Sequence, residues 1–301
     1  MWCVLSTFKL VCPDVFREAR ESHKIQIIGI SNSHFCELAC WTLDAGKIAY
    51  QEHAYMPGQH ILPTMVVRIG GKEKHLSKSS KMCTVTSTES PDNELLQSED
   101  NKPNASSVPI AVLPDGTVLN DSWEIAAYSG LKPIDEVLKK WLDEELGPLS
   151  RQLAYGFILK PSNSSIVDEM FTNESPWWWR CAYVFAGGAI KEAITNEMKP
   201  FDASANKICR EKLEKVVEQI GQRITAKQTR YLGGDSLGVA DIAVASLMAP
   251  LISPPQYVRG RFALLFDNLL KQDKEFNECV QYWRSTVAGG YALDIYDLRN
   301  L

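Results

Sequence analysis

The sequence predicts a small α/β domain followed by an all-helical domain, and three observations support this. A strand, a helix and a second strand follow one another within residues 24–54. A hairpin followed by a helix occupies residues 107–130, and from residue 134 onward the apolar residues recur mostly at helical spacing. Strands joined through a helix pair in parallel. We therefore expect a βαβ-ββα domain and then a helical bundle.

The composition narrows the class of protein. The chain has 301 residues, 45% hydrophobic and 23% charged, which suits two modest globular domains. A net charge of −5 argues against general nucleic-acid binding. No apolar run reaches the ~18 residues that cross a bilayer, so we expect no membrane partner. Eight cysteines without a CxxC pair or a Cys/His ladder disfavour a metal site and predict reduced thiols in a cytoplasmic protein.

The first domain is predicted to span residues 24–131, with residues 1–23 as an N-terminal extension. The β-branched run at 24–30, KIQIIGI, predicts a buried strand. Apolar residues then recur at helical spacing over 34–45, and a glycine follows as a helix stop. The segment IAYQEHA, 48–54, predicts the second strand.

Residues 70–107 interrupt this pattern. They are rich in Ser, Lys, Glu and Asn and contain no aromatic residue, so they bury too little apolar surface to offset their ordering entropy. We predict a disordered insertion here, and a regulatory or partner-binding loop is the alternative. Beyond it, PDG separates two strands, and Asp121 or Ser122 caps a helix with Glu124 in the capping-box position.

The second domain, residues 132–301, is predicted to be helical throughout. Its most apolar segment, 238–251, is hydrophobic on all sides and should be a buried central helix. Further helical patterns run from Ile134 to the Gly147-Pro148 pair and over 175–198, 213–224 and 273–288.

The first domain has the element order of a thioredoxin-like fold. Four segments then stand out in order along the chain. SHFCELACWTLD holds the first strand–helix turn and its helix, and SVPIAVL is a strand opened by a proline. GTVLNDSWEIAAY is a hairpin with the following helix, and YLGGDSLGVADIAVASLMAPL is the buried helix of the second domain. In this order the segments resemble those of the glutathione S-transferase family over about residues 24–290, and the resemblance implies that the proline is cis.

Ser33 is the first candidate catalytic residue. A helix N-terminus favours an anion, and a thiolate held there beside a hydroxyl donor becomes a nucleophile at neutral pH. The resemblance implies that this thiol belongs to bound glutathione, that Ser33 holds the catalytic position with Ser31 as second choice, and that Phe35 lies in the glutathione site. Ser33 as a helix cap alone is the competing interpretation.

Cys36 is the second candidate. Glutaredoxin-like relatives begin this helix with C-P-x-C, whereas this chain has S-H-F-C and keeps only the second cysteine. Cys36 is therefore either a packing residue or the reactive thiol of a glutathione-dependent reductase. A disulfide between Cys36 and Cys40 is not expected within a regular helix. Cys40 also stands where similar sequences often carry a basic residue.

The remaining site residues are implied by the resemblance. Val108 and Pro109 should share a cis bond that turns the Val108 backbone toward the glutathione cysteinyl unit. Asp121 and Ser122 should hold the γ-glutamyl end, although both also serve as helix caps. Asp241 should be the structural capping acid of the second domain.

The function implied by the resemblance is a glutathione transferase that takes glutathione as co-substrate and joins it to apolar electrophiles, in detoxification, as a possible homodimer. A thiol reductase and a non-catalytic binding module are the alternatives. Trp177, Trp178, Trp179 and Tyr183 either line the electrophile pocket or belong to the core, and at least one of the three tryptophans should be exposed. The insertion is expected to replace the family's second helix.

Overall fold

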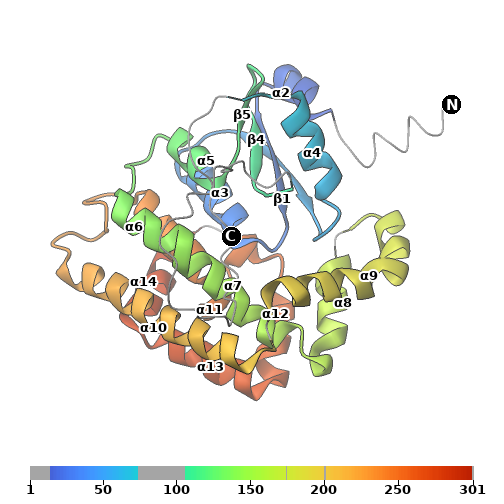
Figure 1. Cartoon of the computed structure of the whole chain (residues 1–301). Helices are drawn as coiled ribbons and strands as arrows, with labels where there is room; N and C mark the ends of the chain where they lie inside the picture. Colours follow the sequence, from blue (N-terminus) through green and yellow to red (C-terminus); the bar gives the residue numbers. More distant parts are fainter. Residues whose placement is uncertain (1–13, 74–105, 174, 200, 300–301) are drawn as a thin grey trace, which may run out of the picture. The chain divides into compact units, whose positions relative to one another are not determined.

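The computed structural model describes residues 14–73, 106–173, 175–199 and 201–299 (Figure 1). These residues divide into two compact units, one of residues 14–73 and 106–131 and one that begins at Lys132. Most of the predicted insertion lies outside the described residues.

The first unit contains one mixed five-stranded sheet in the order β2-β1-β4-β5-β3. Strand β1 pairs in parallel with β2 and antiparallel with β4, and β4 pairs antiparallel with β5. The short β3 extends the edge parallel to β5. This arrangement confirms the predicted thioredoxin-like fold. The strands are β1 (Ile25–Ile30), β2 (Tyr50–Tyr55), β3 (Lys72–Glu73), β4 (Ile110–Val112) and β5 (Thr117–Leu119).

Helices cover both faces of this sheet. On one face, α3 (His34–Ala45) and α5 (Ser122–Tyr128) pack on a core that includes Ile27 and Ala111. On the other face lie α2 (Val15–Ser22) and α4 (Ile61–Gly70) (Figure 1). The buried apolar residues of that face come from two helices and four strands: Val15, Ala19, Ile28, Tyr55, Val67, Ile110, Val112 and Val118.

Two helices of the first unit were not predicted. Helix α2 lies in the segment treated as an extension, yet Val15 and Ala19 are buried against the sheet. Helix α4 occupies residues just before the insertion, so the expectation that the insertion replaces the second helix is wrong. Pro63 obscured α4 in the sequence, because proline usually breaks a helix but is tolerated in the first turn, where its missing N–H has no helical partner.

The second unit is all-helical, which confirms the predicted class. Its centre is α11 (Val239–Ile252), in which thirteen residues are buried. The other elements are α6 (Glu136–Lys140), η1 (Trp141–Leu146), α7 (Gly147–Ile158), η2 (Pro161–Asn163), α8 (Ser164–Thr172), α9 (Trp177–Met198), α10 (Ala203–Ala226), η3 (Tyr257–Gly260), α12 (Ala263–Gln272), α13 (Lys274–Arg284) and α14 (Val287–Tyr296).

The predicted helix end at Gly147-Pro148 is wrong. Helices α6 and α7 continue through this pair by way of η1, a π-helical segment. Proline cannot donate to the carbonyl four residues earlier and its ring crowds that carbonyl. A wider π turn immediately before Pro148 accommodates this without ending the helix.

Asp241 has the structural role that the resemblance implied. Its carboxylate is fully buried and accepts hydrogen bonds from the Gly238 N–H (2.8 Å) and the Leu232 N–H (2.7 Å). The Tyr291 hydroxyl donates to the same carboxylate. Burial raises the pKa of Tyr291, and its hydrogen bond to the Asp241 carboxylate raises this pKa further. The acid therefore joins the start of α11 to α14 and to the preceding turn.

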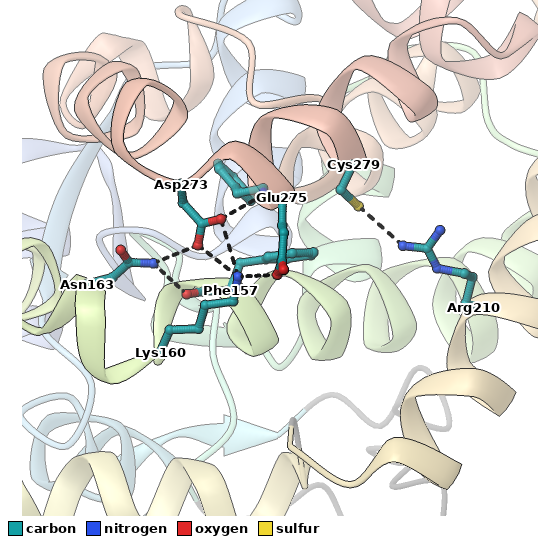
Figure 2. A network of polar contacts seen from close by, with 8 residues as sticks. Phe157, Lys160, Asn163, Arg210, Asp273, Glu275 and Cys279 are labelled. Carbon is teal, nitrogen blue, oxygen red and sulfur yellow. Dashed lines mark hydrogen bonds and ion pairs between the residues drawn. The ribbon is translucent and has the colours of Figure 1, made fainter.

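A second polar network holds α13 against the end of α7 (Figure 2). Lys160 Nζ lies 2.9 Å from Asp273 Oδ2 and 2.8 Å from Glu275 Oε2. Asn163 Nδ2 donates to Asp273 Oδ2 at 3.1 Å and to the Phe157 carbonyl at 2.9 Å. Asp273 also caps α13, so the predicted helix at 273–288 begins as expected but is two helices, α13 and α14.

Candidate functional site

Strand register brings three candidate segments of the first unit to one end of its sheet. Ile28 of β1 faces Ile110 of β4, so β1 ends where β4 starts. Ala111 faces Leu119, so β5 also ends there. Helix α3 follows β1 and helix α5 follows β5, while Pro109 precedes β4 directly. The first turns of two helices and the proline loop therefore share this end of the sheet, which we call the loop end.

Ser33 is the N-cap of α3, as one of the two interpretations predicted. It is half-buried, and its hydroxyl oxygen accepts from the Cys36 N–H at 3.4 Å. Within the described part of the chain its own hydroxyl hydrogen has no assigned acceptor. Ser31 differs, because it is buried and donates its hydroxyl hydrogen to the Tyr55 carbonyl at 3.2 Å. Ser33 is thus the better placed donor at the helix start.

The side chain of Cys36 packs against the backbone of β1. It is buried, and a Cβ atom built on Gly29 would lie only 2.9 Å from its Sγ. Glycine at this position of the strand therefore makes room for the sulfur. Cys36 and Cys40 are both buried cysteines that are not joined in a disulfide. These contacts favour the packing interpretation of Cys36.

The Val108–Pro109 bond is cis, as predicted. The proline itself is buried and Val108 is half-buried. Phe35 is half-buried beside Ser33, with its ring 4.7 Å from the ring of His34.

Arg68, at the end of α4, joins the loop before β4 to the loop after β5. Its Nη2 donates to the Ser107 carbonyl (3.1 Å) and to the Ser107 hydroxyl (3.0 Å). Its Nη1 donates to Asn120 Oδ1 at 2.8 Å, and Nη2 also reaches the Asn120 carbonyl at 3.3 Å. Ser107 precedes Val108, and Asn120 precedes Asp121. One guanidinium therefore fixes both loops that carry the predicted contacts.

Asp121 and Ser122 begin α5 as predicted. Asp121 Oδ1 accepts from the N–H groups of Trp123 and Glu124, each at 2.8 Å, and Glu124 Oε2 accepts from the Asn120 N–H at 2.7 Å. Ser122 is buried. The capping interpretation of Asp121 is confirmed.

His60 stands at the same end of the first unit, immediately before α4. Burial lowers its pKa, while hydrogen bonding to the Met56 and Ser106 backbone acts in the opposite direction. His60 therefore lies close to the backbone of Ser106, at the chain that enters the cis-proline loop. Neither His60 nor Arg68 was predicted, because both act on residues distant in sequence.

The three tryptophans of α9 point in different directions, as predicted. Trp177 is 76% exposed, whereas Trp179 and Tyr183 are buried. Trp179 Nε1 donates to the Phe171 carbonyl at 3.1 Å, and the Tyr183 hydroxyl donates to Asp168 at 2.9 Å. These two residues thus hold α9 on α8, which favours the core interpretation over an electrophile pocket.

The described segments offer neither a helix that could cross a membrane nor a group of metal ligands. None of their helices combines the length and hydropathy needed to cross a bilayer. No group of three or more His, Cys, Asp or Glu side chains there is arranged to hold a metal ion.

No protein-family model and no curated protein matches the sequence. Among solved structures, the chain is similar to glutathione transferase F2 from Populus trichocarpa, with 14% identity over 91% of this chain and 100% of that chain and a TM-score of 0.43. It is similar to glutathione transferase URE2P6 from Phanerochaete chrysosporium, in complex with oxidized glutathione, with 10% identity, coverages of 92% and 98%, and a TM-score of 0.44. It is also similar to a glutathione S-transferase from Methylobacillus flagellatus KT with bound glutathione, with 12% identity over 89% of this chain and 98% of that chain and a TM-score of 0.39. At these low scores, the chain's own topology and contacts must support any assignment.

Proposed function

We propose that the loop end of the first unit binds glutathione and that the protein is a glutathione transferase that joins the glutathione thiolate to apolar electrophiles. The observation that carries this proposal is the shared position of three segments: the start of α3 with Ser33, the cis Val108–Pro109 strand opening, and the start of α5. Each offers a group suited to one part of the tripeptide.

The start of α3 suits the thiolate. Helix α3 has twelve residues, and its N-terminus carries partial positive charge and N–H groups without helical acceptors. A sulfur anion there gains from this field and from the Ser33 hydroxyl hydrogen. Such surroundings lower a thiol pKa by ~1–3 units, which yields a nucleophile at neutral pH.

The other contacts follow from the same arrangement. The Val108 backbone would pair with the cysteinyl unit and Phe35 would flank it. Asp121 and Ser122 would receive the γ-glutamyl end, with Arg68 holding their loop. A homodimer, a cytoplasmic location and a role in detoxification belong to the same proposal. The reductase alternative is less favoured, because the Cys36 sulfur packs on Gly29.

Titration with glutathione tests this proposal. We expect binding, with the ultraviolet absorbance of the bound thiolate appearing at a lower pH than for free glutathione. Ser33→Ala should bind glutathione but lose this shift, and Ser31→Ala is the matched control that should keep it. Conjugation of a chlorinated aromatic substrate should fail in Ser33→Ala and persist in Cys36→Ser.

Three results would contradict the proposal in different ways. Absence of binding at millimolar glutathione would remove both enzyme interpretations and leave a binding module. Reductase activity that disappears in Cys36→Ser would select the thiol reductase. Binding of glutathione without conjugation of any electrophile would leave the site but not the reaction.

A further inference from the structure

The second unit contains an open groove along α10, at the corner where α13 ends and α14 begins. Its volume is about 700 Å³. Sites for small organic molecules usually measure ~300–1,000 Å³. One face of α10, with residues spaced three and four apart, supplies most of its wall. The α10 residues are Glu214, Val217, Glu218, Gly221, Gln222, Thr225 and Ala226.

The floor of the groove is apolar and includes a glycine. Val217, Gly221 and Trp283 are buried at its base, and Val287 forms its far side. A glycine inside a helix is unfavourable relative to alanine. A Cβ atom at Gly221 would meet Val287 Cβ at 3.4 Å, so a side chain would begin to fill the space between α10 and α14.

The rim is acidic. Glu214 and Glu218 lie one turn apart and are both exposed. The Tyr282 hydroxyl is 3.4 Å from Glu214 Oε1, and Gln222 Nε2 is 3.4 Å from Glu218 Oε1. Among the described residues that line the groove there is no Lys, Arg or His.

Cations of the same helix lie near the rim but outside the residues that line the groove. Arg210 lies one turn before Glu214, outside the lining residues, and its Nη2 is 3.9 Å from Cys279 Sγ (Figure 2). Burial and Glu214 raise the pKa of Tyr282, and the positive charge of Arg210 acts in the opposite direction. Lys215, three residues before Glu218, is exposed and also lies outside the lining, so Glu214 and Glu218 are the charged side chains among the described residues that line the groove.

We propose that this groove binds a small organic cation with an apolar body. The cationic head lies beside Glu218, and the apolar body covers Val217 and Val287. The exposed Tyr282 ring offers a further cation-binding face. The proposal is independent of glutathione binding, because every lining residue belongs to the second unit.

Calorimetric titration of the full chain with three probes tests the charge requirement. The probes are 4-phenylbutylammonium, 4-phenylbutan-1-ol and 4-phenylbutyrate, which share one apolar body. We expect the ammonium probe to bind at least about tenfold more tightly than 4-phenylbutyrate, with the alcohol between them. The carboxylates of Glu214 and Glu218 attract the positive probe and repel the negative one. Equal affinities for the three probes, or no binding of the ammonium at ~10 mM, would overturn the proposal.

A pair of variants tests the location. Gln222→Lys places a cation within reach of Glu218, and Gln219→Lys makes the same change on an exposed position of α10 outside the groove. Both keep a good helix former, and the first adds a favourable Glu–Lys pair one turn apart, so both should fold. We expect Gln222→Lys to weaken the binding of 4-phenylbutylammonium by roughly fivefold or more, and Gln219→Lys to weaken it by less than about twofold. An equal effect of the two would overturn the location.

Discussion

Arg68 Nη1 donates a 2.8 Å hydrogen bond to Asn120 Oδ1, across 52 positions of the sequence. The same guanidinium holds Ser107, so the end of α4 determines the spacing of the two loops that flank the proposed glutathione site. None of these contacts involves the proposed ligand. Arg68 is therefore a positioning residue, and its effect should appear in affinity.

Arg68→Ala should weaken glutathione binding by about tenfold or more while the protein stays folded. Hydrogen bonds from a charged donor contribute about 1.5–3 kcal/mol, and 1.4 kcal/mol corresponds to tenfold in affinity. Arg68→Lys should recover little, because an ammonium lacks the planar fork that reaches both loops. Calorimetry with glutathione measures the effect, and the exposed Arg20→Ala is the matched control. Wild-type affinity in Arg68→Ala would show that the loops hold their positions without it.

Asp241→Asn should lower the free energy of unfolding by about 2–4 kcal/mol, because an amide NH₂ would face donors that now meet a buried carboxylate. Tyr291→Phe, which removes one of those donors, should cost less. Denaturant unfolding measures both. The exposed Asp235→Asn is the control and should change stability by under about 0.5 kcal/mol. An Asp241→Asn variant with an unchanged free energy of unfolding would contradict the role assigned to this acid.

Gly29→Ala should destabilise the first unit by about 1–3 kcal/mol, since the new Cβ would approach the Cys36 sulfur to 2.9 Å. Combining it with Cys36→Ala should recover part of this loss, because the sulfur that clashes is gone. Gly188→Ala in α9 is the matched control: a Cβ there meets nothing within 4 Å, and alanine favours the helix. Additive losses in the double variant would show that Cys36 does not pack on this position.

Stability should fall as the pH drops below about 6.5, the ordinary pKa of histidine. Burial lowers the pKa of His53, and this outweighs Glu18 and Glu52, which act in the opposite direction. The unfolded chain therefore binds more protons than the folded one, so acidification favours unfolding. His53 Nε2 lies 2.8 Å from Gln26 Oε1, between β1 and β2.

Denaturant midpoints measured between pH 7.5 and 5.5, a window of about one unit on either side of the ordinary value, check this expectation. His53→Gln should reduce the slope, and His60→Gln should reduce it further, because burial also lowers the pKa of His60. A protein that becomes more stable on acidification over this window would contradict the assignment.

Short-range patterns in the sequence predicted much of the candidate site. Ser33, Asp121 and Asp241 each accept a hydrogen bond from an N–H two or three residues away, and such caps follow from residue type and spacing. The cis bond at Val108–Pro109 came instead from family resemblance. Its geometry is not encoded in the local composition, since most bonds before proline are trans.

The sequence by itself determined the segments β1-α3-β2 and β4-β5-α5, the two classes of unit and the capping residues of α3 and α5, because periodicity and capping act over a few neighbouring residues. Only the tertiary structure decided that α2 and α4 cover the sheet, that Cys36 packs on Gly29 and that Arg68 spans two loops. Those contacts join residues far apart in the chain. They depend on strand register and on packing in three dimensions, which no local pattern specifies.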